Sequence, residues 1–272
     1  MTTQIDAWQA ALLALVQGLT EFLPISSSAH LVLVPMLTDW PDQGLAFDCV
    51  VHLGSLTAVV GYFRQDLLRM VRGWWRTVQA RNLHADHEGR MAWYVLFATI
   101  PVGLAGLMFK DFVEQDLRSL IVIGLASVGF GMLLFWSDRY CRHERDGGSW
   151  TLGHAMMVGF AQMLALIPGT SRSGITMTMA LALGYRRQDA ARFSFLLSIP
   201  VIALAGGLKI RDWLLEPAPG ADGLLLLLGF VLAAVSAWLC IHYFLRFIER
   251  LGMGPFVAYR IGLGMLLLWM AF

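Results

Sequence analysis

The hydrophobic positions of this 272-residue chain fall into six long, nearly continuous runs. The runs cover approximately residues 45–63, 91–109, 118–137, 192–209, 223–245 and 255–272. A run of about 18 or more mostly apolar residues is typical of a membrane span, because a helix of that length crosses the hydrocarbon core of a bilayer. The pattern therefore predicts an all-α membrane protein with six transmembrane helices.

Two further apolar segments, residues 7–37 and 152–184, are interrupted near their centres by polar residues, proline and glycine. The first interruption begins at Pro24 and the second at Pro168. Non-helical backbone at membrane depth is tolerated only where protein or a water-filled cavity surrounds it. We therefore expect both segments to be re-entrant helix–loop–helix hairpins.

The order of these segments repeats along the chain, because each interrupted segment is followed by three spans. The first repeat covers residues 1–150 and the second covers 151–272, and together they form one membrane domain. Gln17 and Gln162 precede the two breaks at similar distances, which is a weak internal echo. Since three crossings are an odd number, the second repeat starts on the opposite side of the membrane, and the predicted arrangement is an inverted repeat.

Composition and charge exclude several other classes of protein. Hydrophobic residues make up 57% of the chain and charged residues only 14%, whereas a soluble domain carries about 25% charged residues. The net charge of +1 says nothing about nucleic acid, and the absence of a basic patch with interleaved aromatics argues against it as a partner. Three widely spaced cysteines indicate neither a disulfide framework nor a metal motif.

The arginines predict the orientation in the membrane. Fourteen of them fall in the loops 64–90, 138–151, 185–192 and 246–252, which lie on one side in this topology. The other side carries only Lys110, Arg118, Lys209 and Arg211. The positive-inside rule places the arginine-rich side in the cytoplasm. The first hairpin then opens to the outside, and the second opens to the cytoplasm.

The first break follows a carboxylate at membrane depth. Gln17 and Glu21 are four residues apart and share one face of a helix. A charged side chain at the bilayer centre costs about 2.5–3.5 kcal/mol, so Glu21 needs a partner. Arg172 in the second hairpin is one candidate, and a divalent cation such as Mg²⁺ is the other. An ion pair that only joins the two hairpins is the structural alternative to a functional site.

Ser26, Ser27, Ser28 and His30 follow in the same hairpin. The serines offer hydroxyl groups and a helix N-cap, and His30 has the chemistry of a base, a nucleophile or a proton donor near neutral pH. A serine with a nearby histidine fits an activated nucleophile. The alternative is a helix cap with small residues for helix packing.

The second break surrounds one arginine with small and hydroxyl-bearing residues, namely Gly169, Thr170, Ser171, Arg172, Ser173 and Gly174. A helix that starts near Ser171 directs the positive end of its dipole at the loop. The guanidinium of Arg172 matches phosphate oxygens with a bidentate fork. These features predict an anion cradle at a helix terminus, without the spacing of a Walker loop.

Together the two motifs resemble the signatures of the bacterial undecaprenyl-diphosphatase family of the bacitracin-resistance type. The resemblance covers essentially the whole chain, and Tyr259-Arg260 after Pro255-Phe256 is similar to the last span of that family. It implies hydrolysis of undecaprenyl diphosphate to the monophosphate and phosphate, dependence on Mg²⁺ or Ca²⁺, and an active site that faces the periplasm from the bacterial inner membrane. The implied role is recycling of the lipid carrier for peptidoglycan synthesis, with bacitracin resistance.

The resemblance also implies roles for individual residues. Glu21 and Gln17 match the acidic, cation-binding motif, Ser27 and His30 the catalytic pair, and Arg172 the phosphate binder. The residues expected to contact the substrate are Gln17, Ser26, Ser28, Gly169, Thr170, Ser171, Ser173 and Gly174. Gln17 departs from the pattern, since many members carry glutamate there, and this departure weakens cation binding through charge at that position.

A lipid-phosphate flippase or transporter is the competing hypothesis, because inverted repeats with helix ends aimed at an anion are typical of transporters as well. The cluster of Glu21, Ser27 and His30 favours the phosphatase, since anion binding alone does not require it. The sequence leaves open whether Ser27, His30 or water attacks the phosphorus. It also leaves open whether the chain acts alone or as a homodimer.

Three remaining features receive other interpretations. The tract from His84 to Glu88 resembles a metal site but lies in the basic loop, where a solvated loop is the better explanation. Leu67 to Val78, with two tryptophans among arginines, predicts an interfacial helix on anionic lipid. Arg260 in the last span either extends to the membrane surface or pairs inside the protein.

Overall fold

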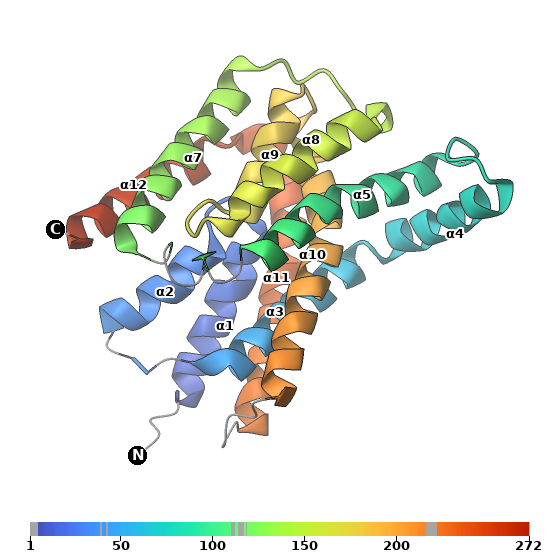
Figure 1. Ribbon diagram of the computed structural model, residues 1–272. Helices are drawn as coiled ribbons and strands as arrows, with labels where there is room; N and C mark the ends of the chain where they lie inside the picture. The colour runs from blue at the N-terminus through green and yellow to red at the C-terminus, as the bar shows by residue number, and fades with distance from the viewer. Residues whose placement is uncertain are drawn as a thin grey trace.

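The computed structural model consists of helices and describes residues 5–38, 40–41, 43–109, 112–113, 117, 119–215 and 222–271. Six of the helices described are long and apolar enough to cross a membrane (Figure 1). They are α3 (Gly44–Tyr62), α5 (His87–Met108), α7 (Leu120–Tyr140), α10 (Arg187–Leu215), α11 (Gly223–Leu251) and α12 (Gly254–Ala271). The six predicted spans are therefore confirmed as helices.

Helices α10 and α11 are longer than the apolar runs that predicted them. Helix α10 begins at Arg187 rather than near residue 192, and α11 continues to Leu251 rather than to residue 245. The extra turns are polar and carry charges that suit helix ends, such as Asp189 in the first turn of α10 and Arg250 in the last turn of α11. Hydropathy marks the apolar part of a helix and does not mark its polar ends.

Each interrupted segment is a pair of helices joined by a short break. The first pair is α1 (Ala7–Phe22) and α2 (Ser27–Thr38), and the second is α8 (Leu152–Gln162), continued by the 3₁₀ turn η2 (Met163–Leu166), and α9 (Arg172–Ala182). Leu23 has the extended backbone that a following proline favours, which ends α1. The members of each pair contact each other.

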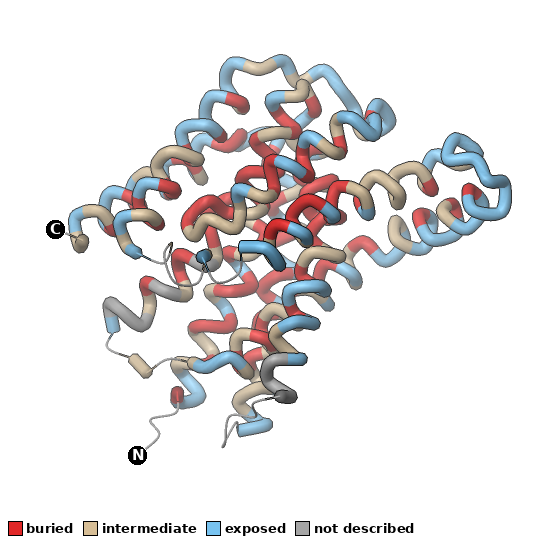
Figure 2. Tube along the Cα trace, in the orientation of Figure 1, coloured by how far each residue is buried: buried red, intermediate tan, exposed pale blue. Residues whose placement is uncertain are grey.

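The long helices pack against these two pairs. Helix α1 packs against α11, α8 packs against α5, α3 packs against both α10 and α11, and α7 packs against α12. Small residues permit these close approaches. A Cβ atom on Gly18 of α1 would lie 2.6 Å from the carbonyl oxygen of Ala233, and one on Gly159 of α8 would lie 2.4 Å from that of Ala98. Buried residues concentrate where the broken helices meet the long ones (Figure 2).

The predicted interfacial segment is a helix, α4 (Arg64–Ala80), which packs along α5 and forms with it a hairpin that projects from the other helices (Figure 1). Asp86 caps α5 by accepting a hydrogen bond from the backbone N–H of Gly89. This bond, together with the neighbouring Arg76, holds the pKa of the Asp86 carboxyl group below its ordinary value. Contact of α4 with lipid stays a prediction.

Candidate active site

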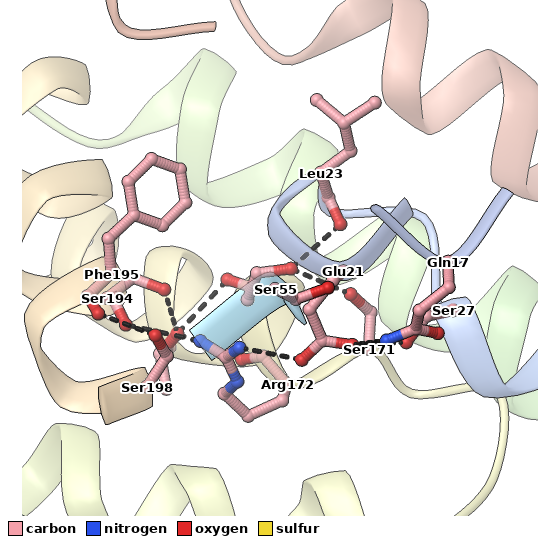
Figure 3. A network of polar contacts seen from close by, with 12 residues as sticks. Gln17, Glu21, Leu23, Ser27, Ser55, Ser171, Arg172, Ser194, Phe195 and Ser198 are labelled. Carbon is pink, nitrogen blue, oxygen red and sulfur yellow. Dashed lines mark hydrogen bonds and ion pairs between the residues drawn. The ribbon is translucent and has the colours of Figure 1, made fainter. Parts of the chain in front are cut away.

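The last turn of α1 and the first turn of α9 bring a carboxylate and a guanidinium together inside the protein (Figure 3). Nη2 of Arg172 lies 3.0 Å from Oε1 of Glu21, and the two side chains are only 13% and 9% exposed. The structure thus provides the protein partner that the sequence predicted for Glu21. It joins residues that are 151 positions apart in the chain.

The other oxygen of the Glu21 carboxylate is also occupied. Oε2 accepts a hydrogen bond of 2.9 Å from Nε2 of Gln17 and another of 2.9 Å from Oγ of Ser27. A buried ion pair is stable only when further hydrogen bonds satisfy its members, and these two donors meet that requirement. Gln17, Glu21, Ser27 and Arg172 therefore form one connected polar cluster, of which the sequence predicted only the pairing of Glu21 with Arg172.

Arg172 is anchored on two sides. Its Nη1 donates to the carbonyl oxygen of Ser194 in α10 over 3.3 Å, while Nη2 donates to Glu21. The two terminal nitrogens of the guanidinium, which the sequence analysis assigned to phosphate, therefore already donate hydrogen bonds to α1 and α10. An incoming phosphate would have to share or displace these partners.

Hydroxyl groups of the second break hold it against the first. Oγ of Ser173 donates to the carbonyl oxygen of Leu23 over 2.8 Å, and Oγ of Ser171 accepts from the backbone N–H of Gly174 over 3.1 Å. The second bond caps α9, as predicted for a helix that starts near Ser171. Gly169 has a φ of +91°, and a Cβ atom there would lie 2.4 Å from the carbonyl oxygen of Ile123. Glycine is thus needed at that position.

Thr170 contributes the remaining hydroxyl of the second break. Its side chain is fully buried, and its Oγ1 has no hydrogen-bond partner among the described residues. Ser28 lies in the first turn of α2, but its side chain is outside the described part of the structure. Both residues stay predicted contacts of the substrate.

The ring nitrogens of His30 bond groups outside the carboxylate cluster. Its Nδ1 lies 2.7 Å from the carbonyl oxygen of Ser26, and its Nε2 lies 2.6 Å from the hydroxyl of Tyr259 in α12. Ser27, which is near His30 in the sequence, donates its hydroxyl to Glu21 instead. The structure therefore pairs Ser27 with Glu21 and His30 with Tyr259, and the expected serine–histidine contact is not among the hydrogen bonds described.

Arg260 is a site residue whose place the sequence left open. Its side chain is 1% exposed, and it donates to the carbonyl oxygens of Pro24, Ser127 and Gly169 at 3.3, 3.3 and 3.0 Å. It therefore pairs internally and ties both breaks to α7, and no carboxylate in the described ranges pairs with it. Burial in an apolar run required a partner, but only the fold could show that backbone carbonyls supply it.

The side chains near Glu21 include oxygen atoms of the kind that bind a hard cation. Oε1 of Gln17 is buried and has no hydrogen-bond partner within the described ranges, and an amide oxygen and a carboxylate are typical ligands of Mg²⁺ and Ca²⁺. The described residues contain no group of three or more His, Cys, Asp or Glu side chains that could hold a metal. The residues therefore fit an ion that also binds phosphate oxygens.

A multi-pass helical fold that buries a carboxylate, a guanidinium and two serine-rich breaks defines a membrane protein with a polar interior site. The chain belongs to the bacitracin resistance protein BacA family, whose family model matches residues 10–266. It is 55% identical to undecaprenyl-diphosphatase 2 of Stutzerimonas stutzeri over 267 residues, which cover 97% of this chain and 98% of that protein. It is 54% identical to the undecaprenyl-diphosphatase of Thioalkalivibrio sulfidiphilus over 266 residues, covering 98% and 99% of the two chains.

Proposed function

We propose that this chain is a membrane phosphatase that hydrolyses undecaprenyl diphosphate to the monophosphate and phosphate. The reaction returns the lipid carrier to cell-wall synthesis and confers resistance to bacitracin. The names of its relatives and the family to which it belongs support this function. The observation that carries it is the buried pair of Glu21 and Arg172, which lies where the two breaks meet.

In this proposal the diphosphate lies between the two breaks. Arg172 and the backbone N–H groups of residues 171–173 bind the phosphoryl oxygens and stabilise the charge that builds on them in the transition state. Burial of the guanidinium strengthens that interaction, because water does not screen it. The hydroxyl groups of Ser171 and Ser173 hold the break in place through their bonds to Gly174 and Leu23.

Glu21 and the amide oxygen of Gln17 would hold Mg²⁺ or Ca²⁺, which neutralises phosphate charge when it is bound. Ser27 carries the hydroxyl that already donates to Glu21. Glu21 is therefore positioned to accept a proton from Ser27, or from a water molecule in its place, as that oxygen approaches phosphorus. His30, which is held by Ser26 and Tyr259, is the third candidate for the group that attacks phosphorus, besides Ser27 and water.

The two broken helix pairs are proposed as re-entrant hairpins of an inverted repeat. The packing of α1 on α11 has its counterpart in the packing of α8 on α5. Ser26 and Ser171 also share the left-handed backbone conformation, with φ of 72° and 69°. They lie at equivalent distances after Gln17 and Gln162, so the two breaks have similar local geometry, which supports the internal repeat. The arginine-rich loops support a cytoplasmic placement of their side, with the active site open to the periplasm.

Phosphate release from a polyprenyl diphosphate tests the function directly. Purified protein in detergent should release phosphate with Mg²⁺ or Ca²⁺ and stop in excess chelator. Arg172→Ala should abolish release while the protein still inserts in the membrane. Release that continues at the wild-type rate in Arg172→Ala would contradict the proposed phosphate site, and absence of release with every cation would contradict the phosphatase.

Transport of the lipid monophosphate is a second candidate function, favoured by the shared geometry of the two breaks at Ser26 and Ser171. Vesicles that contain the protein and a fluorescent polyprenyl monophosphate in one leaflet would test it. Movement of the label to the other leaflet, faster than in vesicles with Glu21→Ala protein, would support transport. Equal rates would leave hydrolysis as the function.

A further inference from the structure

Both nitrogen atoms of the His30 ring are engaged, and their partners define its protonation. Nδ1 lies 2.7 Å from the carbonyl oxygen of Ser26, which has no hydrogen to donate. Nδ1 must therefore carry the proton and donate it. In the neutral imidazole Nε2 then carries the lone pair, so the hydroxyl of Tyr259, 2.6 Å away, donates to Nε2.

Tyr259 covers the one atom of His30 that can act as a base. The His30 side chain is 8% exposed, whereas Tyr259 is 47% exposed. The two rings are nearly parallel, with an angle of 6° between their planes and 5.5 Å between their centroids. The next residue, Arg260, is fixed to the carbonyl oxygens of Pro24 and Gly169. Because Arg260 is fixed in this way, helix α12 holds the phenol of the neighbouring Tyr259 beside the two breaks.

We propose that Tyr259 is a positioning residue of the phosphatase reaction: its hydroxyl group holds the imidazole of His30 in one orientation before reaction and leaves Nε2 when that atom takes part. This inference rests on the proposed function for its kinetic consequence and on the two hydrogen bonds of His30 for its geometry. A ring held at both nitrogens cannot flip or rotate, so Nε2 keeps a fixed direction relative to the two breaks. Loss of the phenol hydroxyl leaves the ring held only by Ser26.

Tyr259→Phe removes this hydroxyl and keeps the aromatic ring. The matched control is Tyr243→Phe in α11, because Tyr243 is also exposed and its hydroxyl makes no hydrogen bond with the described residues. We expect kcat for phosphate release from polyprenyl diphosphate to fall about tenfold or more in Tyr259→Phe, since misplacement of a reacting group by about 1 Å can cost 100-fold. KM should stay within about twofold, and Tyr243→Phe should resemble the wild type.

The geometry has a readout that does not depend on turnover. Diethyl pyrocarbonate attacks the lone pair of a neutral imidazole, so the bond from Tyr259 should slow the modification of His30. Mass spectrometry should show His30 modified several-fold faster in Tyr259→Phe than in the wild type. Modification of His84, an exposed histidine of the α4–α5 loop, should be unchanged and serves as the internal standard.

Several outcomes would overturn the proposal. An unchanged or higher kcat in Tyr259→Phe would show that the hydroxyl does not position His30 for catalysis. A raised KM with unchanged kcat would assign Tyr259 to substrate binding instead. An unchanged modification rate of His30 would show that the hydroxyl of Tyr259 does not form the hydrogen bond with Nε2. If the wild type released no phosphate with any cation, the proposed function would fail, while the modification rates would still decide whether Tyr259 holds His30.

Discussion

The carboxylate of Glu21 and the guanidinium of Arg172 stabilise each other inside the protein. Removal of one charge therefore leaves the other buried without its partner. Glu21→Gln should leave Arg172 as an unpaired buried charge and lower the free energy of unfolding by about 3 kcal/mol. Phosphate release should fall at least about 100-fold, because the variant loses the proposed proton acceptor and cation ligand. Thermal unfolding in detergent and phosphate assays measure the two effects.

The double variant Glu21→Gln/Arg172→Met separates charge balance from catalysis. It removes both charges, so its unfolding temperature should return close to the wild-type value, while its activity stays lost. A double variant as unstable as Glu21→Gln would show that the charges are not coupled in the folded protein.

Gln17 offers a test of the proposed cation site. Gln17→Glu adds a second carboxylate beside Glu21, so the Mg²⁺ concentration for half-maximal activity should fall several-fold, because a second charged oxygen binds a hard cation more strongly. Gln188→Glu, which adds the same charge to an exposed position of α10, is the control and should leave it unchanged. An unchanged Mg²⁺ requirement in Gln17→Glu would place the cation elsewhere.

For individual residues, the sequence predicted a contact correctly where a buried charge required a partner of opposite charge. Glu21 needed a partner at membrane depth, and Arg172 is that partner. The direction of His30 toward Tyr259 could not be predicted, because the two residues lie 229 positions apart and only the packing of α12 brings them together. The bond from Ser27 to Glu21 was equally hidden, since it depends on the turn between α1 and α2.

The distances between packed helices determine where the side chains of the site lie. Gly18 lies where α1 meets α11, and a Cβ atom there would lie 2.0 Å from Oγ of Ser236 and 2.6 Å from the carbonyl oxygen of Ala233. Gly18→Ala should therefore push α1 away from α11 and lower the free energy of unfolding by about 1–3 kcal/mol. Because α1 also carries Gln17 and Glu21, phosphate release should fall with it.

Gly129→Ala in α7 is the matched control, because a Cβ atom there meets nothing within 4 Å. It should be neutral or stabilise the protein by about 0.5–1 kcal/mol, as alanine favours helix over glycine. Thermal unfolding of the two variants side by side measures the difference. Equal unfolding temperatures would mean that α1 and α11 can separate without cost.

The elements themselves were predictable to within a few residues, because a bilayer requires long apolar helices. Each break was predictable from its proline and serines. The conformation within the breaks was not, since serine rarely adopts a positive φ, yet Ser26 and Ser171 both do. Hydrogen bonds such as that from Ser173 to Leu23 support these turns and appear only when the two segments meet.

The proposed topology of the whole molecule predicts which cysteines are accessible from each side of the membrane. Cys141 lies just after α7 in an arginine-rich loop and is partly exposed, whereas Cys49 and Cys240 are buried. A membrane-impermeant maleimide should therefore label Cys141 in inside-out vesicles and not in intact spheroplasts, because positive loops face the cytoplasm. Mass spectrometry of the labelled chain measures the difference.

Asp222→Cys before α11 provides the opposite control, since residue 222 is exposed on the other side of the proposed topology. It should be labelled in intact spheroplasts. Labelling of Cys141 from outside, together with protection of residue 222, would reverse the proposed orientation and place the active site in the cytoplasm.

The bond between Arg172 and Glu21 has a consequence for how a catalytic cycle would end. A phosphate ion that leaves an unpaired buried guanidinium would strand a charge in a low-dielectric interior, and departure would be slow. Here Glu21 bonds the same Nη2 group, 3.0 Å away, and would take the place of the departing anion. Under the proposed function, the enzyme thus carries its own competing ligand, which weakens product inhibition by inorganic phosphate and favours rapid exchange over tight retention.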